Sequence, residues 1–168
     1  YKIKRGKREE YIETEASLVG LLFELGAEDQ QLVHLKSKRV FKDKAFVELL
    51  RLLNELEQLV KGIGRSRIDL PAYFQRLDRK KGLPLYLIRM DGETHFLYDD
   101  EELAKFAQKH ELKLDELDKA SASTNIQFTE LYEASELEDL RKKLEKLDLS
   151  LDEYFPSDAK PAFKLVGE

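Results

Sequence analysis

Histidines are the side chains of this chain best suited to acid–base or metal chemistry, and their spacing favours neither. His34, His95 and His110 lie far apart, without an HExxH pattern, and the chain has no cysteine. No zinc site and no nucleophile–base pair is therefore predicted. Gly62-Ile63-Gly64 lacks both the Lys-Ser/Thr of a P-loop and the longer spacing of a dinucleotide-binding turn. We predict no catalytic, cofactor-binding or metal-binding residue.

The acidic run Asp99-Asp100-Glu101-Glu102 has the carboxylates of a cation site. It stands at the expected start of a helix, where the positive end of the helix dipole favours acidic side chains. We interpret the run as a helix N-terminus and not as a metal site.

Two basic segments have the chemistry needed for phosphate contacts. Residues 1–12 carry five basic side chains against two acidic ones, and residues 61–81 carry seven against two. Phosphate contacts give DNA affinity without sequence specificity. The DNA-binding candidates are Lys2, Lys4, Arg5, Lys7, Arg8, Arg65, Arg67, Arg79, Lys80 and Lys81. An ordinary solvated surface explains the same clusters, and so does the dipole of a helix that ends in cations.

The composition is that of a globular, charge-rich chain. Its 168 residues fit one domain with a core of its own. Charged residues make up 38% of the chain, against about a quarter in typical proteins. The net charge of -5 argues against a uniformly basic nucleic-acid binder, so DNA contacts have to come from local patches. The lack of cysteine fits a cytoplasmic location, and no apolar run approaches the ~20 residues of a membrane span.

The elements that would position these residues alternate between strands and amphipathic helices. Residues 1–12 are predicted to form a hairpin that turns at Arg5-Gly6, and Asp91-Gly92 is a strong hairpin signal. Further strands are expected within residues 31–41, 83–98, 126–132 and 163–166. Helices are expected from Thr14 to Gly26, from residue 43 or 44 to Gly62, from Asp69 to Lys81, after Asp99, and after a capping box of Ser135 and Glu138.

This element order predicts the fold class. Strands and helices alternate without the long Val/Ile runs of a buried parallel sheet, and the Asp91-Gly92 turn requires an antiparallel pair. We expect an α+β fold in which a small mixed or antiparallel sheet with hairpins is covered by amphipathic helices. Residues 111–124 lose periodicity and end in Ala120-Ser121-Ala122-Ser123-Thr124, and residues 118–125 are a candidate flexible loop.

The opening hairpin also carries a family signature. Tyr1-Lys2-Ile3-Lys4-Arg5-Gly6-Lys7, followed by Glu10-Tyr11-Ile12 and Glu13, resembles a segment of the Toprim domain of the DNA gyrase B subunit and its topoisomerase IV counterpart. In that family a Tyr-Lys-x-x-x-Gly-Lys hairpin precedes a short acidic, helical stretch. Some bacterial members carry a long insert of similar length at that point. The motif covers residues 1 to about 15, and the rest matches in length and element order.

The resemblance implies a single insert domain over residues 1–168 of a type IIA topoisomerase B subunit. Residues 1–15 and 161–168 would be the hairpin and return strand next to the host Toprim domain, and residues 16–160 the insert body. The family's magnesium-binding glutamate and Asp-x-Asp pair have no matching positions here, and the ATP-binding region is absent. Mg²⁺ and ATP would therefore belong to the parent enzyme, an ATP-dependent DNA topoisomerase.

The same resemblance implies the partners. The insert would have no catalysis of its own and would support the placement of double-stranded DNA, which it would bind weakly and without sequence preference. It would also contact the gyrase A subunit and other domains of the gyrase B subunit, in the cytoplasm and away from membranes.

The ends of the chain carry two further expectations. An insert enters and leaves its host at neighbouring points, so Phe163 to Val166 is expected beside the opening hairpin. The chain begins at Tyr1 without a methionine, and we expect a fragment preceded by a magnesium-binding Asp-x-Asp.

Two alternative functions have weaker support in the sequence. A free-standing cytoplasmic protein-interaction module would bind its partner through acidic faces, such as residues 91–119 with ten acids against four lysines. A small hydrolase has no motif in its support.

Overall fold

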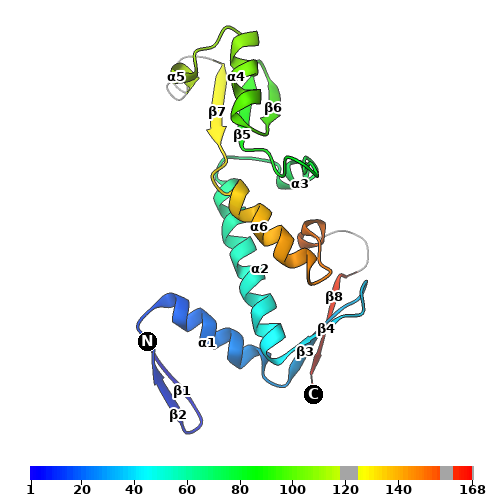
Figure 1. The fold of residues 1–168 in the computed structure, drawn as a ribbon. Helices are drawn as coiled ribbons and strands as arrows, with labels where there is room; N and C mark the ends of the chain where they lie inside the picture. The colour runs from blue at the N-terminus through cyan, green and yellow to red at the C-terminus, as the bar shows by residue number, and fades with distance from the viewer. Residues whose placement is uncertain (118–124, 156–160, 168) are drawn as a thin grey trace. The chain divides into compact units, whose positions relative to one another are not determined.

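The computed structural model describes residues 1–117, 125–155 and 161–167, which form two compact units (Figure 1). The first unit is Tyr1–Glu55 with Pro156–Glu168, and the second is Leu56–Phe155. Helices combine with antiparallel sheets, which confirms the predicted α+β class, although the strands are divided among three small sheets. Most of the predicted flexible loop 118–125 lies outside the described residues. None of the described helices has the length and apolar character needed to span a bilayer.

The opening hairpin pairs β1 (Lys2–Arg5) with β2 (Arg8–Tyr11) in a two-stranded antiparallel sheet. Its turn is Gly6-Lys7, one residue later than predicted, because Arg5 still pairs with Arg8. Gly6 has a φ of +60°, the positive value that the first central residue of a type II′ turn needs. Tyr1 and Ile12 close the open end with two backbone hydrogen bonds of 2.7 and 2.8 Å.

A three-stranded antiparallel sheet of the first unit consists of β3 (Gln30–His34), β4 (Val40–Lys42) and β8 (Phe163–Gly167), in the order β4-β3-β8. The predicted return strand thus forms, but it pairs with β3 and not with the opening hairpin, which corrects the expected placement. The packing gives the reason. His34 is fully buried, its ring lies 5.2 Å from that of Phe163, and its Nδ1 hydrogen-bonds Ser37 Oγ at 2.7 Å.

Two helices complete the first unit. α1 (Glu15–Ala27) is capped by Thr14, whose hydroxyl accepts a hydrogen bond from the N–H of Ser17 at 3.2 Å. The helix ends at Ala27, so Gly26, the predicted stop, lies inside it. α2 (Asp43–Gly64) is the predicted long helix, and its residues up to Glu55 belong to this unit. The buried side chains of that half are Phe46, Leu49 and Leu52.

A second three-stranded antiparallel sheet, in the order β6-β5-β7, lies in the second unit. β5 (Tyr86–Met90) and β6 (Glu93–Leu97) form the predicted hairpin, and β7 (Ile126–Glu130) pairs with the other edge of β5. Asp91 and Gly92 have φ values of 51° and 83°. Two positive φ values in succession are the requirement of a type I′ turn, which confirms the Asp-Gly prediction.

The second unit also contains several helical segments. They are the end of α2, α3 (Leu70–Phe74), α4 (Asp100–Lys109), α5 (Leu114–Leu117), α6 (Ala134–Glu145) and the 3-10 helix η2 (Leu151–Tyr154). The ring of His95 lies 5.0 Å from Phe106 of α4, and the ring of Phe96 lies 6.0 Å from Tyr73 of α3. Neighbouring residues of a strand point to opposite faces, so β6 lies between α4 and α3.

Two predicted helix boundaries in this unit are wrong. The helix expected from Asp69 to Lys81 ends at Phe74, because the chain then turns back and the buried Tyr73 hydroxyl donates to the carbonyl of Pro84 at 2.9 Å. Its predicted cap forms, with Asp69 accepting from the N–H of Ala72.

The capping box of Ser135 and Glu138 does not form. The N-cap of α6 is Glu133, because the N–H of Ala134 already bonds to the carbonyl of Leu131 at 3.1 Å. Glu138 binds Arg141 instead. A capping box does form at the start of η2, where the N–H of Ser150 donates to Glu153 at 3.0 Å.

The type I′ turn gives a test of the second sheet. Replacing Gly92 by alanine puts a Cβ on a residue whose φ is +83°, so we expect the Gly92→Ala variant to lose about 1–2 kcal/mol of unfolding free energy. Gly26→Ala is the matched control, because Gly26 lies in α1 with open space around its Cβ position and should be neutral to stabilising. Urea unfolding followed by circular dichroism measures both. Equal stability of the two variants would contradict the assigned turn.

Candidate nucleic-acid interface

The ten predicted DNA-binding residues divide between the two compact units. Lys2, Lys4, Arg5, Lys7 and Arg8 belong to the opening hairpin of the first unit. Arg65, Arg67, Arg79, Lys80 and Lys81 belong to the second unit. The candidates thus lie on three segments, namely the hairpin, the loop after α2 and the loop 78–82.

In the hairpin group, one carboxylate pairs with two of the lysines. Glu9 Oε1 lies 3.1 Å from Lys2 Nζ and 3.9 Å from Lys4 Nζ, and Lys2 also lies over the ring of Tyr11. Lys7 occupies the turn and is exposed. The backbones of Arg5 and Arg8 stand directly opposite each other beside the turn. The tip of the hairpin therefore carries more basic residues than its open end.

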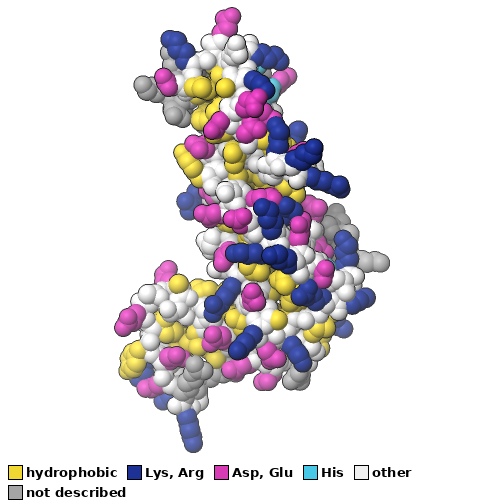
Figure 2. All heavy atoms as spheres, viewed as in Figure 1, with side chains coloured by type: hydrophobic (Ala, Val, Ile, Leu, Met, Phe, Trp, Pro, Cys, Tyr) yellow, Lys and Arg dark blue, Asp and Glu magenta, His cyan; other side chains and the backbone are white. Residues whose placement is uncertain are grey.

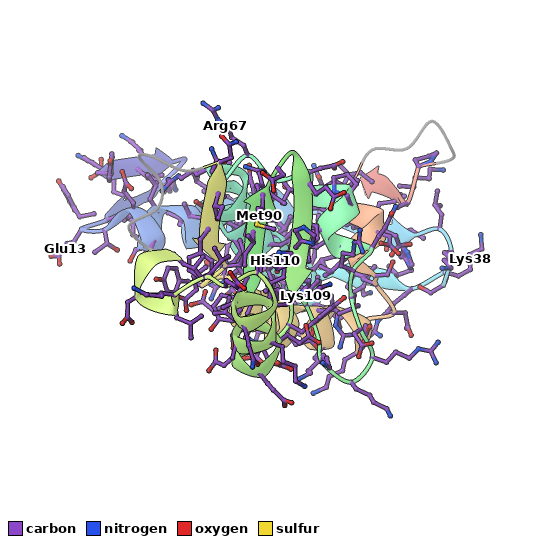
Figure 3. All side chains as sticks on the ribbon, turned by 90° about the horizontal axis from the view of Figure 1, so that it is seen from above. Glu13, Lys38, Arg67, Met90, Lys109 and His110 are labelled. Atoms are coloured by element: carbon purple, nitrogen blue, oxygen red, sulfur yellow. The ribbon has the colours of Figure 1, made fainter. Side chains whose placement is uncertain are left out.

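The first loop of the second unit follows α2 and carries Arg65 and Arg67. Backbone hydrogen bonds wind residues 65–67 into a turn, and Arg67 has a φ of 53°. The guanidinium of Arg89, on β5, donates to the carbonyls of Ser66 at 3.4 Å and Arg67 at 2.6 Å. Arg89 thus fixes the loop backbone. The side chains of Arg65 and Arg67 are exposed, and Figure 3 shows Arg67 projecting away from the ribbon.

The second loop, residues 78–82, is closed by backbone hydrogen bonds between Asp78 and Gly82 in both directions, at 2.9 and 3.0 Å. Asp78 Oδ1 also accepts from the N–H groups of Lys80 at 2.7 Å and Lys81 at 2.9 Å. The N–H of Lys81 first, and then that of Lys80, lowers the pKa of the Asp78 carboxyl. The carboxylate thereby organises the loop, and Arg79 and Lys80 are exposed at its tip. Figure 2 shows Lys and Arg side chains gathered beside α3 and this loop.

Lys81 differs from its neighbours because its charge is already paired. Its Nζ binds Glu102 and lies 3.4 Å from Asp99 Oδ2, at the start of α4. The hydrogen bond with Glu102 raises the pKa of Lys81, and the Lys81 ammonium lowers the pKa of Glu102. A cation held by two carboxylates has less charge available for a phosphate. In contrast, Arg65, Arg67, Arg79 and Lys80 form no ion pair with another described residue.

The acidic run 99–102 serves the start of α4. Asp99 accepts from the N–H of Glu102 at 2.8 Å, which is the main cause of its lowered pKa. Glu102 also accepts from the N–H of Tyr98, and Glu101 binds Lys105 at 2.5 Å. No group of three metal-ligating side chains occurs among the described residues. The run therefore acts as a helix N-terminus, as the dipole argument predicts.

Sequence reasoning missed two groupings. The rings of His95 and His110, which are far apart in the sequence, both lie against Phe106 with their own centroids 6.4 Å apart, and the four-residue spacing of Phe106 and His110 at the end of α4 was the available signal. Exposed lysines also surround the β4-β3-β8 sheet, and the basic run from Lys36 to Lys44 was the signal for them. They include Lys36, Lys38, Lys42 and Lys164.

Removing the carboxylate of Asp78 should loosen the basic loop. In Asp78→Ala we expect the amides of Lys80 and Lys81 to exchange with D₂O faster, because both lose their acceptor. Acidic pH should also loosen the loop. Since the folded-state pKa of Asp78 is lowered, these contacts are intact above the ordinary carboxyl pKa of about 4 and are lost as the pH falls through the lowered value.

Hydrogen exchange followed by NMR measures this effect. Asp139→Ala, a carboxylate removed from the exposed surface of α6, is the control and should leave both amides unchanged. Unaltered exchange of Lys80 and Lys81 in Asp78→Ala would show that the carboxylate does not organise the loop.

One curated protein resembles this chain. The chain is 23% identical over 133 residues to the DNA gyrase B subunit of Chlamydia pneumoniae, and the match covers 76% of the chain. It covers 16% of the length of that protein. No protein-family model matches the chain, and no solved structure matches it. The similarity supports a distant relation to the B subunit of DNA gyrase.

Proposed function

We propose that this chain is a non-catalytic insert domain within the Toprim region of a bacterial DNA gyrase-like B subunit, where it helps to place duplex DNA. The Tyr-Lys-x-x-x-Gly-Lys hairpin of residues 1–7 and the similarity to a gyrase B subunit over most of the chain support the insert. The small share of that protein which is matched fits a segment of a larger polypeptide.

Four exposed cations of the second unit carry the DNA part of the proposal. Arg65, Arg67, Arg79 and Lys80 have no carboxylate partner among the described residues, whereas Lys81, Lys61 and Lys105 do. Both loops are also fixed, one by Arg89 and the other by Asp78. Unpaired cations on loops whose backbones are already held lose less conformational freedom when they bind phosphates, and such contacts are insensitive to sequence.

The cofactors and protein partners are inferred from the family resemblance. Mg²⁺ and ATP belong to the parent topoisomerase and not to this segment, and the protein partners would be the gyrase A subunit and other domains of the gyrase B subunit in the cytoplasm. The alternative, a free-standing interaction module with acidic binding faces, has fewer unpaired acids in the 91–119 segment, because Asp99 and Glu102 bind Lys81 and Glu101 binds Lys105.

The DNA contact is tested on the 168-residue chain with labelled duplex DNA. We expect non-specific affinity in the range of about 10⁻⁴ to 10⁻⁶ M that falls steeply with salt. In Arg79→Gln/Lys80→Gln, and separately in Arg65→Gln/Arg67→Gln, we expect weaker binding and a salt slope flatter by up to ~0.9 for each lost contact. Fluorescence anisotropy over a salt series measures both quantities.

The control removes the same charge from paired lysines. Lys61 lies 2.8 Å from Glu57 and Lys105 lies 2.5 Å from Glu101, so Lys61→Gln/Lys105→Gln should change the salt slope least. Equal effects of test and control variants would show that only net charge matters. If the test variants fold and bind DNA with unchanged affinity, neither loop contacts DNA.

The insert assignment has its own test in the coding sequence on either side of these residues. A magnesium-binding Asp-x-Asp shortly before Tyr1 is the expected result. A start codon at that position would exclude the insert and favour the free-standing module.

A further inference from the structure

A surface groove runs between α1 and the first half of α2, entirely within the first unit. It consists of two adjoining hollows that share Glu24, Arg51 and Glu55. Arg51 of α2 reaches α1 beside Gly20, where a Cβ would stand 3.5 Å from the guanidinium, an ordinary contact distance. Arg51 Nη2 lies 4.0 Å from Glu24 Oε1. The two helices thus touch through this pair and leave the groove open on both sides of it.

The lining of the groove combines apolar and acidic side chains. Side chains of both helices contribute apolar surface, namely Val19, Phe23 and Ala27 of α1 and Val47 and Leu52 of α2. Carboxylates outnumber cations, seven to two. The acids are Glu10, Glu15, Glu24, Glu28, Asp43, Glu48 and Glu55, and the bases are Lys44 and Arg51.

α1 itself is apolar on more than one side. A helix that is hydrophobic all round is normally buried all round. Yet Leu22 of α1 is 51% exposed, and Val19 and Phe23 are only partly buried. Figure 2 shows apolar surface over this helix with acidic groups beside it. The helix therefore has more apolar surface than the first unit covers.

We propose that the α1–α2 groove binds an amphipathic helix of a protein partner, with a leucine-rich side in the groove and lysines or arginines toward the rim. Charge complementarity selects this occupant, because the excess of carboxylates repels DNA phosphates and attracts cations. The apolar lining selects a helix with an apolar stripe over a merely basic chain, since two flanking helices offer a third one a groove to pack in. This inference does not depend on the DNA role of the second unit.

The test uses the 168-residue chain and a fluorescent peptide of leucine and lysine, with leucines at positions i, i+3, i+4 and i+7. We expect saturable binding that weakens about fivefold in Glu48→Gln/Glu55→Gln. It should also weaken in Val47→Thr, which keeps the side-chain shape but adds a hydroxyl to the lining. Circular dichroism establishes that each variant is folded. The matched control, Glu136→Gln/Asp139→Asn, removes two exposed acids from α6 and should bind as the unaltered chain does.

Two results would overturn the groove. One is a control variant that weakens binding as much as the groove variant does, and the other is a scrambled peptide of the same composition that binds equally well. Arg79→Gln/Lys80→Gln should leave peptide affinity unchanged, so failure of the DNA proposal and failure of this one are distinguishable.

Discussion

The ion pairs of Lys81 with Asp99 and Glu102 determine which cations of the second unit stay available. They tie loop 78–82 to the first turn of α4, while Asp78 holds the loop backbone from within. Exposed ion pairs contribute little to stability, so the main effect of these pairs is to position the loop. Arg79 and Lys80 are left at the tip without a carboxylate. In a chain with nearly as many basic as acidic residues, the cations that form no ion pair after folding are those that we propose for phosphate contacts.

Local sequence signals predicted those elements whose geometry is set within a few residues. The Asp91-Gly92 turn, the Thr14 and Asp69 caps and the long α2 are of this kind, because each depends on backbone conformations and side-chain contacts between near neighbours. The basic residues of the candidate interface were also found from local charge. Their pairing was not, since Lys81 and Glu102 meet only through the tertiary fold.

The wrong predictions concern elements whose geometry is set by contacts between residues far apart in the sequence. β8 was expected beside the opening hairpin, but strand partners are chosen by side-chain packing, and the contact of the buried His34 with the partly buried Phe163 places it on β3. The helix predicted up to Lys81 has suitable residues, yet the buried Tyr73–Pro84 hydrogen bond and the Asp78 loop end it at Phe74. Tertiary contacts outweigh helix propensity over so short a segment.

The two proposed surfaces lie in different units, with unpaired cations on two loops of the second unit and an acidic groove in the first. A nucleic acid and a basic protein segment can therefore be bound without competing for one surface. The central claim is that duplex DNA meets Arg65, Arg67, Arg79 and Lys80. The most direct measurement is an NMR titration of the ¹⁵N-labelled chain with a short DNA duplex. We predict chemical-shift changes at residues 65–67 and 79–80 that vanish at high salt, with none along the α1–α2 groove. An unchanged spectrum, or changes confined to other surfaces, would contradict the claim.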